Sequence, residues 1–251
     1  MSYKTKYDLI FSIGAACSCT QVLRKCRVQY FSYPFDWIVG CNLIDRCKML
    51  TNNLEKFIDK EDLEFSHKVE STQCNAYKNK FNDILFNHDF KINETLDEGY
   101  ERVRSKYQRR LERLYSQIEK SNKILVVYLQ LPNKNEMLDD DTLIEAYNIL
   151  QNKIGGGYKV NFLYLYNTEN IKLKDRKSTK INQNIEKVTC EYNGYNKELS
   201  YAVNFKHLRK YFSIYKISTK FMDRKNFFKR LKFRIRFLFT YIQQLKIESK
   251  K

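Results

Sequence analysis

Cys17 is the residue whose type and surroundings best suit covalent chemistry. It follows the apolar run Leu9–Ile13 and Gly14, and a helix-like run begins soon after it, at Thr20. A thiol at the start of a helix faces the positive end of the helix dipole, which favours the nucleophilic thiolate. The pattern therefore predicts that Cys17 is a nucleophile at the carboxyl edge of a sheet, where open α/β proteins place their ligands.

A thiol nucleophile also needs a base and a group that orients the base. The chain contains three histidines, and His88 is the one that ends a short apolar run, as a base at the edge of a sheet would. Asp89, Asp36 and Asn87 are the candidates for orienting it. The structural alternative is that Cys17 fills space in the core and that His88 caps a turn, because free cysteines are often simply buried.

Other residues near these two have open roles. Cys19 is a rival thiol that would face the core from the first helical turn. Asp36 could cap a helix, bond Arg24 or lie in the site, whereas Phe35 and Trp37 are expected to be buried anchors of the turn that contains them. Three arginines lie on the predicted helix 97–120: Arg109, Arg110 and Arg113. They would either be solvated on a helix face or bind an anionic substrate, for which the guanidinium group is well suited.

Neither a metal nor a cofactor is expected. The seven cysteines show no paired ligand spacing, since Cys17-x-Cys19 is shorter than a zinc knuckle and lacks a second pair. The triple glycine at 155–157 follows a predicted helix, so it is a helix terminus and not a phosphate loop.

The elements that must position these residues alternate between strands and helices. Apolar runs predict strands, and apolar spacings of three and four predict helices. The predicted strands cover 7–13, 81–90, 124–129, 159–166 and 185–192; the predicted helices cover 18–26, 42–50, 53–58, 97–120, 141–153 and 205–214. Residues 59–78 and 167–183 are expected to be irregular. This order favours an α/β fold, a three-layer sandwich with a mostly parallel sheet.

The positive charge is concentrated at one end of the chain. Of the net charge of +17, residues 206–251 contribute fifteen Lys and Arg against two acids. We therefore divide the chain into an α/β domain, 1–215, and a basic amphipathic C-terminal helix, 216–251. The apolar stripe from Phe228 to Leu245, flanked by basic residues, predicts that 217–247 docks on an anionic membrane surface. Packing on the protein's own body is the alternative, and nucleic acid is unlikely because no binding motif accompanies the charge.

The expected location is the cytoplasm, with peripheral attachment at the inner face of the membrane. An odd number of cysteines without a regular framework favours a reducing compartment. The apolar run before Cys17 is too short, and Asp8 too close to it, for a signal peptide.

Several short motifs, taken together, resemble one family across about residues 8–170. The motifs are Ser12-Ile13-Gly14-x-x-Cys17, Leu23-Arg24, Ser32-Tyr33-Pro34-Phe35-Asp36-Trp37, His88-Asp89-Phe90 and the segment from Tyr107 to Arg113. They are similar to those of an uncharacterised family known as papain-like cysteine peptidases. The order of elements differs from papain, in which the cysteine lies on a long helix and the histidine on a later antiparallel barrel.

The resemblance implies a thiol-dependent hydrolase or transferase. Cys17 would attack an acyl-type bond, His88 would shuttle the proton, Asp89 or Asp36 would orient His88, and backbone amides at 15–18 would stabilise the oxyanion. Cys17 and His88 are then expected within hydrogen-bond reach of one another. The resemblance leaves the substrate open between a peptide and a glycan-linked group, the second because family members accompany bacterial surface-polysaccharide genes. The alternative is a non-catalytic binding or assembly protein, or a transferase, for surface-polysaccharide synthesis.

Overall fold

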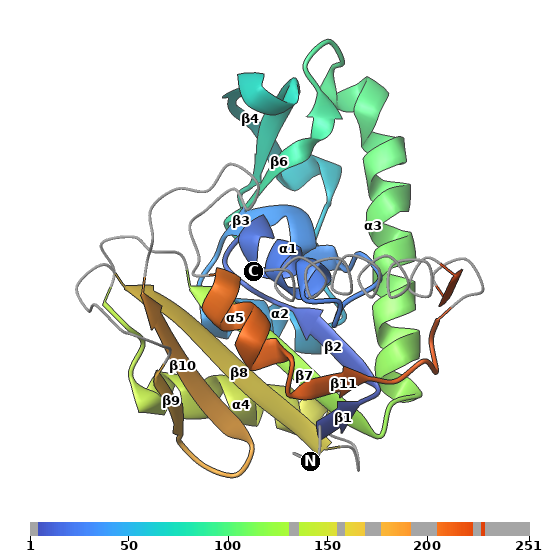
Figure 1. Ribbon diagram of the computed structural model, residues 1–251. Helices are drawn as coiled ribbons and strands as arrows, with labels where there is room; N and C mark the ends of the chain where they lie inside the picture. Colours follow the sequence, from blue (N-terminus) through green and yellow to red (C-terminus); the bar gives the residue numbers. More distant parts are fainter. Residues whose placement is uncertain are drawn as a thin grey trace, which may run out of the picture. The chain divides into compact units, whose positions relative to one another are not determined.

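The computed structural model describes residues 5–130, 136–154, 159–168, 177–191, 205–222 and 227–228. The chain forms two compact units, which divide between Ile217 and Ser218. The first unit is an α/β body with several sheets (Figure 1).

The largest sheet has five strands in the order β2-β7-β8-β10-β9. Its strands are β2 (Leu9–Ser12), β7 (Lys123–Gln130), β8 (Lys159–Thr168), β10 (Ile185–Glu191) and β9 (Lys177–Lys180). The first four are parallel, and β9 pairs antiparallel with β10. Near-continuous apolar sequence in β2 and β7 fits strands that are covered on both faces. The predicted α/β class and mostly parallel sheet are therefore confirmed, although β9 falls in a segment expected to be irregular.

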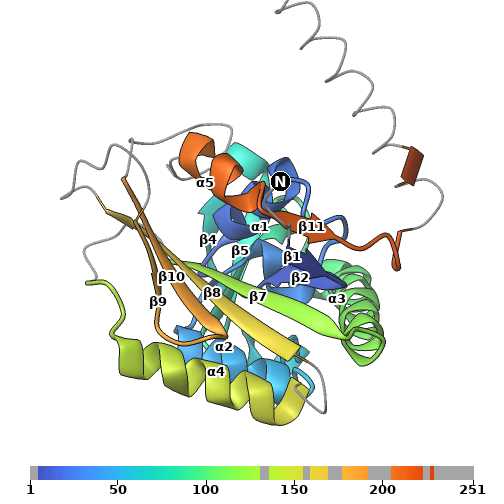
Figure 2. The same cartoon turned by 60° about the horizontal axis from the view of Figure 1, so that its bottom comes forward.

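Helices lie against both faces of this sheet (Figure 2). The helices α1 (Cys17–Lys25) and α5 (Phe205–Phe212) lie on one side, and α2 (Leu43–Thr51) and α4 (Asp140–Ile154) lie on the other. Side chains from α1 and α5, including Val22, Leu23 and Leu208, share a buried apolar cluster with Val127 and Leu163 of the sheet. This packing fixes α1, and hence Cys17, against the carboxyl ends of β2 and β7.

A second, antiparallel sheet was not predicted. Its order is β3-β6-β5-β4, from strands β3 (Ile38–Gly40), β6 (Ile84–Lys91), β5 (Cys74–Asn79) and β4 (Leu63–Val69). The predicted irregular structure over 59–78 is thus wrong, because β4 is an edge strand with mostly exposed side chains and lacks an apolar pattern. The predicted helix over 53–58 is also wrong, since Asn53, Leu54 and Lys56 have positive φ.

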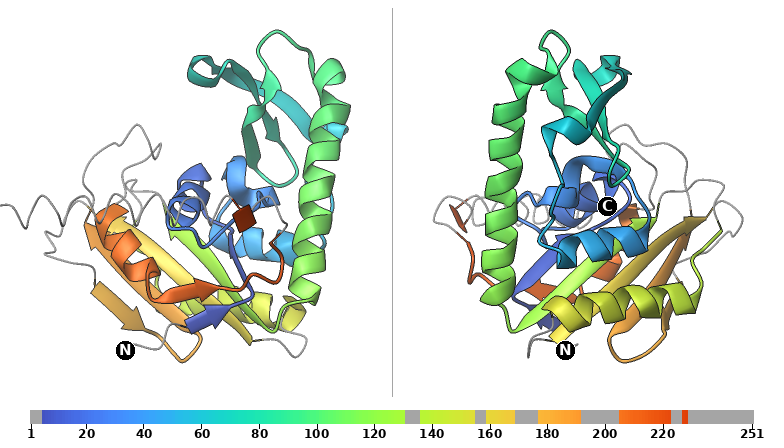
Figure 3. Two further views of the ribbon diagram at one scale, coloured as in Figure 1. Left: turned by 45° about the vertical axis from the view of Figure 1, so that its right-hand side comes forward. Right: turned by 180° about the vertical axis from the view of Figure 1, so that it is seen from behind.

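The long helix α3 (Leu96–Glu119) runs beside the second sheet (Figure 3). It begins with a capping box, in which Thr95 and Glu98 satisfy each other's backbone amides. Its face of Val103, Tyr107 and Leu114 is buried, as the spacing predicted.

A short parallel pair joins the two ends of the first unit. The strand β1 (Thr5–Tyr7) pairs with β11 (Tyr215–Ile217). The predicted helix at 217–247 does not begin at Ile217, since that residue belongs to β11 and residues 218–222 are neither helix nor strand. Residues 227–228 are helical, and the other residues from 223 onward lie outside the described part of the chain. No helix among the described residues has the length and apolar character needed to cross a bilayer.

Candidate active site

The junction between β2 and α1 places Cys17 at the first position of a helix. Ala16 is the N-cap, with an extended backbone, and Cys17 begins α1 with only 6% of its surface exposed. Helix amides in the first turn have no carbonyl four residues earlier to accept their hydrogen bonds. The nucleophile expected from the sequence therefore lies at a helix N-terminus, beside backbone donors and the positive end of the dipole.

Cys19 lies two positions further and belongs to the core. Its Sγ lies 3.7 Å from the Val127 carbonyl oxygen, and burial raises the pKa of its thiol to about 12. Gly14 makes this packing possible, because a Cβ at Gly14 would lie 2.5 Å from the Cys19 Cβ. Cys19 thus stays a neutral thiol under Gly14, and Cys17 remains the candidate nucleophile.

Arg46 of α2 holds the loop before Cys17 in place. Its fully buried guanidinium donates to the carbonyl oxygens of Gly14 (2.6 Å), Ile13 (3.4 Å) and Ala15 (3.3 Å). It also donates to the carbonyls of Gly40 at 2.5 Å and Cys41 at 3.3 Å. One side chain therefore connects the nucleophile loop to the segment after the Pro34–Trp37 turn. Sequence reasoning missed Arg46, because an arginine on an amphipathic helix looks like a surface residue and its partners are backbone carbonyls.

The Pro34–Trp37 turn is a 3-10 helix that Asp36 stabilises from inside. The Asp36 Oδ2 accepts hydrogen bonds from the Tyr33 amide and from Gln29 Nε2, both at 2.8 Å. Burial raises the pKa of this carboxyl to about 6, although the Tyr33 amide, Gln29 and the nearby Arg24 and Arg110 each act to lower it. Of the roles left open by the sequence, the structure shows a cap for Asp36, and its Oδ1 has no hydrogen-bond partner.

The two aromatic residues of this turn differ in exposure. Phe35 is fully buried, as expected, whereas Trp37 is in the intermediate range and keeps part of its surface exposed. The Trp37 ring lies under the guanidinium of Arg24, 5.9 Å from its centroid, and meets the ring of His88 at 6.3 Å in an edge-to-face contact. Trp37 thus connects α1 with the strand that carries His88.

His88 lies at an irregularity of β6. Between the pairs Tyr77–Phe86 and Asn75–Phe90, three residues of β6 lie opposite one residue of β5. Such bulges re-aim side chains and are frequent beside active sites. His88 is half-buried, and burial lowers the pKa of its imidazole, with the Asp89 charge opposing and the Lys106 charge adding to this effect. The ring is therefore neutral near pH 7, as a general base must be.

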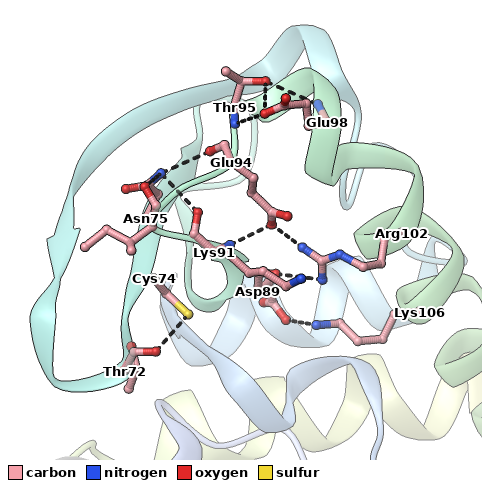
Figure 4. A network of polar contacts seen from close by, with 11 residues as sticks. Thr72, Cys74, Asn75, Asp89, Lys91, Glu94, Thr95, Glu98, Arg102 and Lys106 are labelled. Atoms are coloured by element: carbon pink, nitrogen blue, oxygen red, sulfur yellow. Dashed lines mark hydrogen bonds and ion pairs between the residues drawn. The ribbon is translucent and has the colours of Figure 1, made fainter.

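Asp89 connects β6 to α3. Its buried carboxylate accepts a hydrogen bond from the Tyr107 hydroxyl at 2.8 Å. The same carboxylate pairs with Lys106, and Arg102 donates to the backbone carbonyl of Asp89 (Figure 4). Glu94 continues this network by pairing with Arg102. In the described part of the chain, no hydrogen bond joins His88 to Cys17, Asp36 or Asp89. Both candidate acids are thus engaged elsewhere, and Asp89 acts on His88 through its charge.

The three candidate anion-binding arginines of α3 differ in exposure. Arg109 is exposed, whereas Arg110 and Arg113 are half-buried on the side that faces the Pro34–Trp37 turn. Arg113 Nη1 donates to the Ser32 carbonyl at 3.1 Å, and Arg24 Nη2 donates to the Ser32 hydroxyl at 2.6 Å. Asn87, a third candidate orienting residue, has a buried Oδ1 without a hydrogen-bond partner.

A cavity of about 450 Å³ lies elsewhere, between α2 and the β5–β6 turn. Residues such as Lys48, Met49, Lys56 and Phe81 line it, and no predicted site residue does. Among the described residues, no group of three or more His, Cys, Asp or Glu side chains is arranged to hold a metal ion.

The first unit is thus an α/β body with a cysteine at the start of its first helix and a histidine on its antiparallel sheet. Residues 8–170 match the family described as "Putative papain-like cysteine peptidase (DUF1796)", and the chain belongs to this family. The chain is also similar to "Uncharacterized protein R408" of Acanthamoeba polyphaga mimivirus, with 24% identity over 206 residues, covering 75% of this chain and 91% of the viral protein. No solved structure matches the chain significantly.

Proposed function

We propose that the protein is a thiol-dependent hydrolase or transferase that uses Cys17 to attack an acyl-type bond. The observation that carries this proposal is the position of Cys17 as the first residue of α1, directly after the N-cap Ala16. This position lowers a thiol pKa and supplies amide donors next to the sulfur. Membership of the family supports the general kind of chemistry.

In the proposed reaction, His88 takes the proton of the Cys17 thiol and the thiolate attacks the acyl carbon. The carbonyl oxygen becomes an oxyanion near the amides at the start of α1. The amide of Ala15 is bonded to the Leu129 carbonyl at 3.2 Å, which narrows the expected donor set of 15–18 to residues 16–18. The leaving group departs with the proton from His88, and water or another acceptor then releases the acyl group from the sulfur. Asp89 supports the imidazolium by charge, and catalytic contacts tighten when substrate binds.

The test is the reactivity of Cys17. In the intact protein, iodoacetamide near neutral pH should label Cys17 and leave the buried Cys19 unmodified, with the modified peptides identified by mass spectrometry. Cys17→Ser should remove that label. His88→Gln should slow the labelling of Cys17, because glutamine cannot accept the thiol proton as the neutral imidazole does. A Cys17 that reacts no faster than an ordinary thiol would contradict the proposal.

We also propose that the α/β domain is a three-layer sandwich.

The positive charge of residues 206–251 favours an alternative function for the protein. In that alternative, the protein is a non-catalytic binding or assembly protein, or a transferase, for surface-polysaccharide synthesis, and 217–247 docks it on an anionic membrane. An unreactive Cys17 together with binding to anionic vesicles would favour the non-catalytic form.

A further inference from the structure

Four basic side chains gather beside the Pro34–Trp37 turn. Lys106, Arg110 and Arg113 lie at positions i, i+4 and i+7 of α3 and therefore share one face of that helix. Arg24 reaches the same place from α1, since it and Arg113 both donate to Ser32. All four side chains are half-buried, so they are partly ordered and still reach solvent.

Each of the three arginines lies over an aromatic ring. Arg24 lies over Trp37 at 5.9 Å, Arg110 over Tyr107 at 5.1 Å and Arg113 over Phe31 at 5.3 Å, measured from the guanidinium carbon to the ring centroid. Stacking fixes the plane of a guanidinium and leaves its N–H edge for hydrogen bonding. The arginines are thus held in place before any ligand arrives.

These arginines lack acidic partners. Among the described residues, none of the three forms an ion pair, and Arg24 Nε and Arg110 Nη1 are buried without a hydrogen-bond partner. The charge of the Asp36 carboxyl acts on both Arg24 and Arg110, but this carboxyl donates to or accepts from neither: its Oδ2 accepts from Tyr33 and Gln29, and its Oδ1 has no hydrogen-bond partner. Asp89 is occupied by Lys106 and Tyr107. Unpaired, desolvated guanidinium donors are costly in a folded protein unless a ligand satisfies them.

We propose that Arg24, Arg110 and Arg113 form a site for an oxyanion group, a carboxylate or a phosphate, carried by the substrate. The site adjoins His88 through Trp37, so a bound anion would place the rest of the substrate beside the base. The assignment of the bound molecule as substrate rests on the proposed function, whereas anion binding itself does not need Cys17.

The experiment measures binding of two probes, inorganic phosphate and succinate, to the full-length protein by isothermal titration calorimetry. The preferred probe distinguishes a tetrahedral from a planar anion. Arg24→Gln and Arg110→Gln should each raise Kd by about tenfold or more, because each removes a charge-assisted hydrogen bond. Arg110→Lys keeps the charge without the planar fork and should bind with intermediate affinity.

Arg109→Gln is the matched control, because Arg109 adjoins Arg110 on α3 but is exposed. It should leave Kd unchanged, and Cys17→Ser should do the same. Equal weakening by Arg109→Gln and Arg110→Gln, or no binding of either probe at millimolar concentration, would overturn the site. Failure of Cys17 labelling with intact anion binding would instead count only against the proposed chemistry. Circular dichroism of each variant separates lost binding from lost folding.

Discussion

Two cysteines two positions apart on α1 differ in their surroundings. Cys17 begins the helix, whereas Cys19 turns into the core under Gly14, where burial raises its pKa to about 12. A helix rotates its side chains by about 100° per residue, so two positions are enough to move a thiol from the site to the core. In the proposed function, the positions of the two thiols around the helix therefore distinguish Cys17 from Cys19.

Asp36 gives a pH-dependent prediction at the residue scale. Burial raises the pKa of Asp36 from 3.8 to about 6, so the native state holds this proton more tightly than the unfolded chain does. As pH rises from about 4 to about 6, the unfolded chain ionises first, and the stability that this group contributes at low pH is lost.

The variant Asp36→Asn stays neutral and should lack this change. The unfolding free energy of the wild type, relative to that of Asp36→Asn, should fall by about 1–3 kcal/mol over this range and stay flat above it. Urea denaturation at several pH values measures the difference, with the exposed Asp59→Asn as control. A difference that is constant from pH 4 to 7 would show that the Asp36 carboxyl is not perturbed.

At the scale of elements, α2 acts through one side chain. Arg46 donates to five carbonyl groups from two separate segments, 13–15 and 40–41. The carbonyl groups of three consecutive residues, 13–15, accept hydrogen bonds from Arg46. A side chain that is not part of this loop therefore holds the backbone conformation before Cys17. The order of the loop before Cys17 thus depends on a side chain from a separate element, α2.

The prediction is that Arg46→Met lowers the free energy of unfolding by about 3 kcal/mol or more, since buried carbonyls lose charge-assisted donors. Folded Arg46→Lys, which keeps the charge but reaches fewer carbonyls, should alkylate more slowly at Cys17 than the wild type. Chemical denaturation and iodoacetamide kinetics measure the two effects, and the exposed Lys48→Met on the same helix is the control. If Arg46→Lys is alkylated at Cys17 as fast as the wild type, Arg46 does not position Cys17.

The sequence predicts some elements well for identifiable reasons. The apolar run before Gly14 marks the β2–α1 junction, and the spacing from Tyr100 to Ile118 marks α3 within one residue at each end. It does not predict β4, whose side chains are mostly solvent-exposed, or the role of Arg46, whose partners are backbone atoms. The contacts of Trp37 with Arg24 and His88 were not predicted either, because these residues come from distant elements. Local patterns report local structure, whereas these features arise from tertiary contacts.

At the scale of the whole molecule, the boundary of the first unit can be tested by truncation. A chain that ends at Ile217 keeps β11 and should melt as the full-length protein does, whereas a chain that ends at Ser213 loses β11. The second truncation removes the buried Ile217 and the Tyr215 contact with Tyr7, so its Tm should be lower by roughly 5–15 °C.

The same chains test membrane docking by residues 217–247. Co-sedimentation with anionic and neutral vesicles should show binding of the full-length protein to anionic vesicles alone and no binding of the chain that ends at Ile217. Equal partitioning of the two proteins, or loss of folding on truncation at Ile217, would show that the basic segment belongs to the folded body.

The pairing of β1 with β11 also has a consequence for synthesis on the ribosome. Thr5 emerges from the ribosome before its partner Tyr215, which follows about 210 residues later. At about 5–20 residues per second, β1 waits roughly 10–40 s for its partner strand. β2 follows β1 directly and leads to Cys17, so the strand just before this segment stays unpaired until β11 has been synthesised. A translational pause at any point between β1 and β11 would therefore prolong the exposure of the unpaired strand β1.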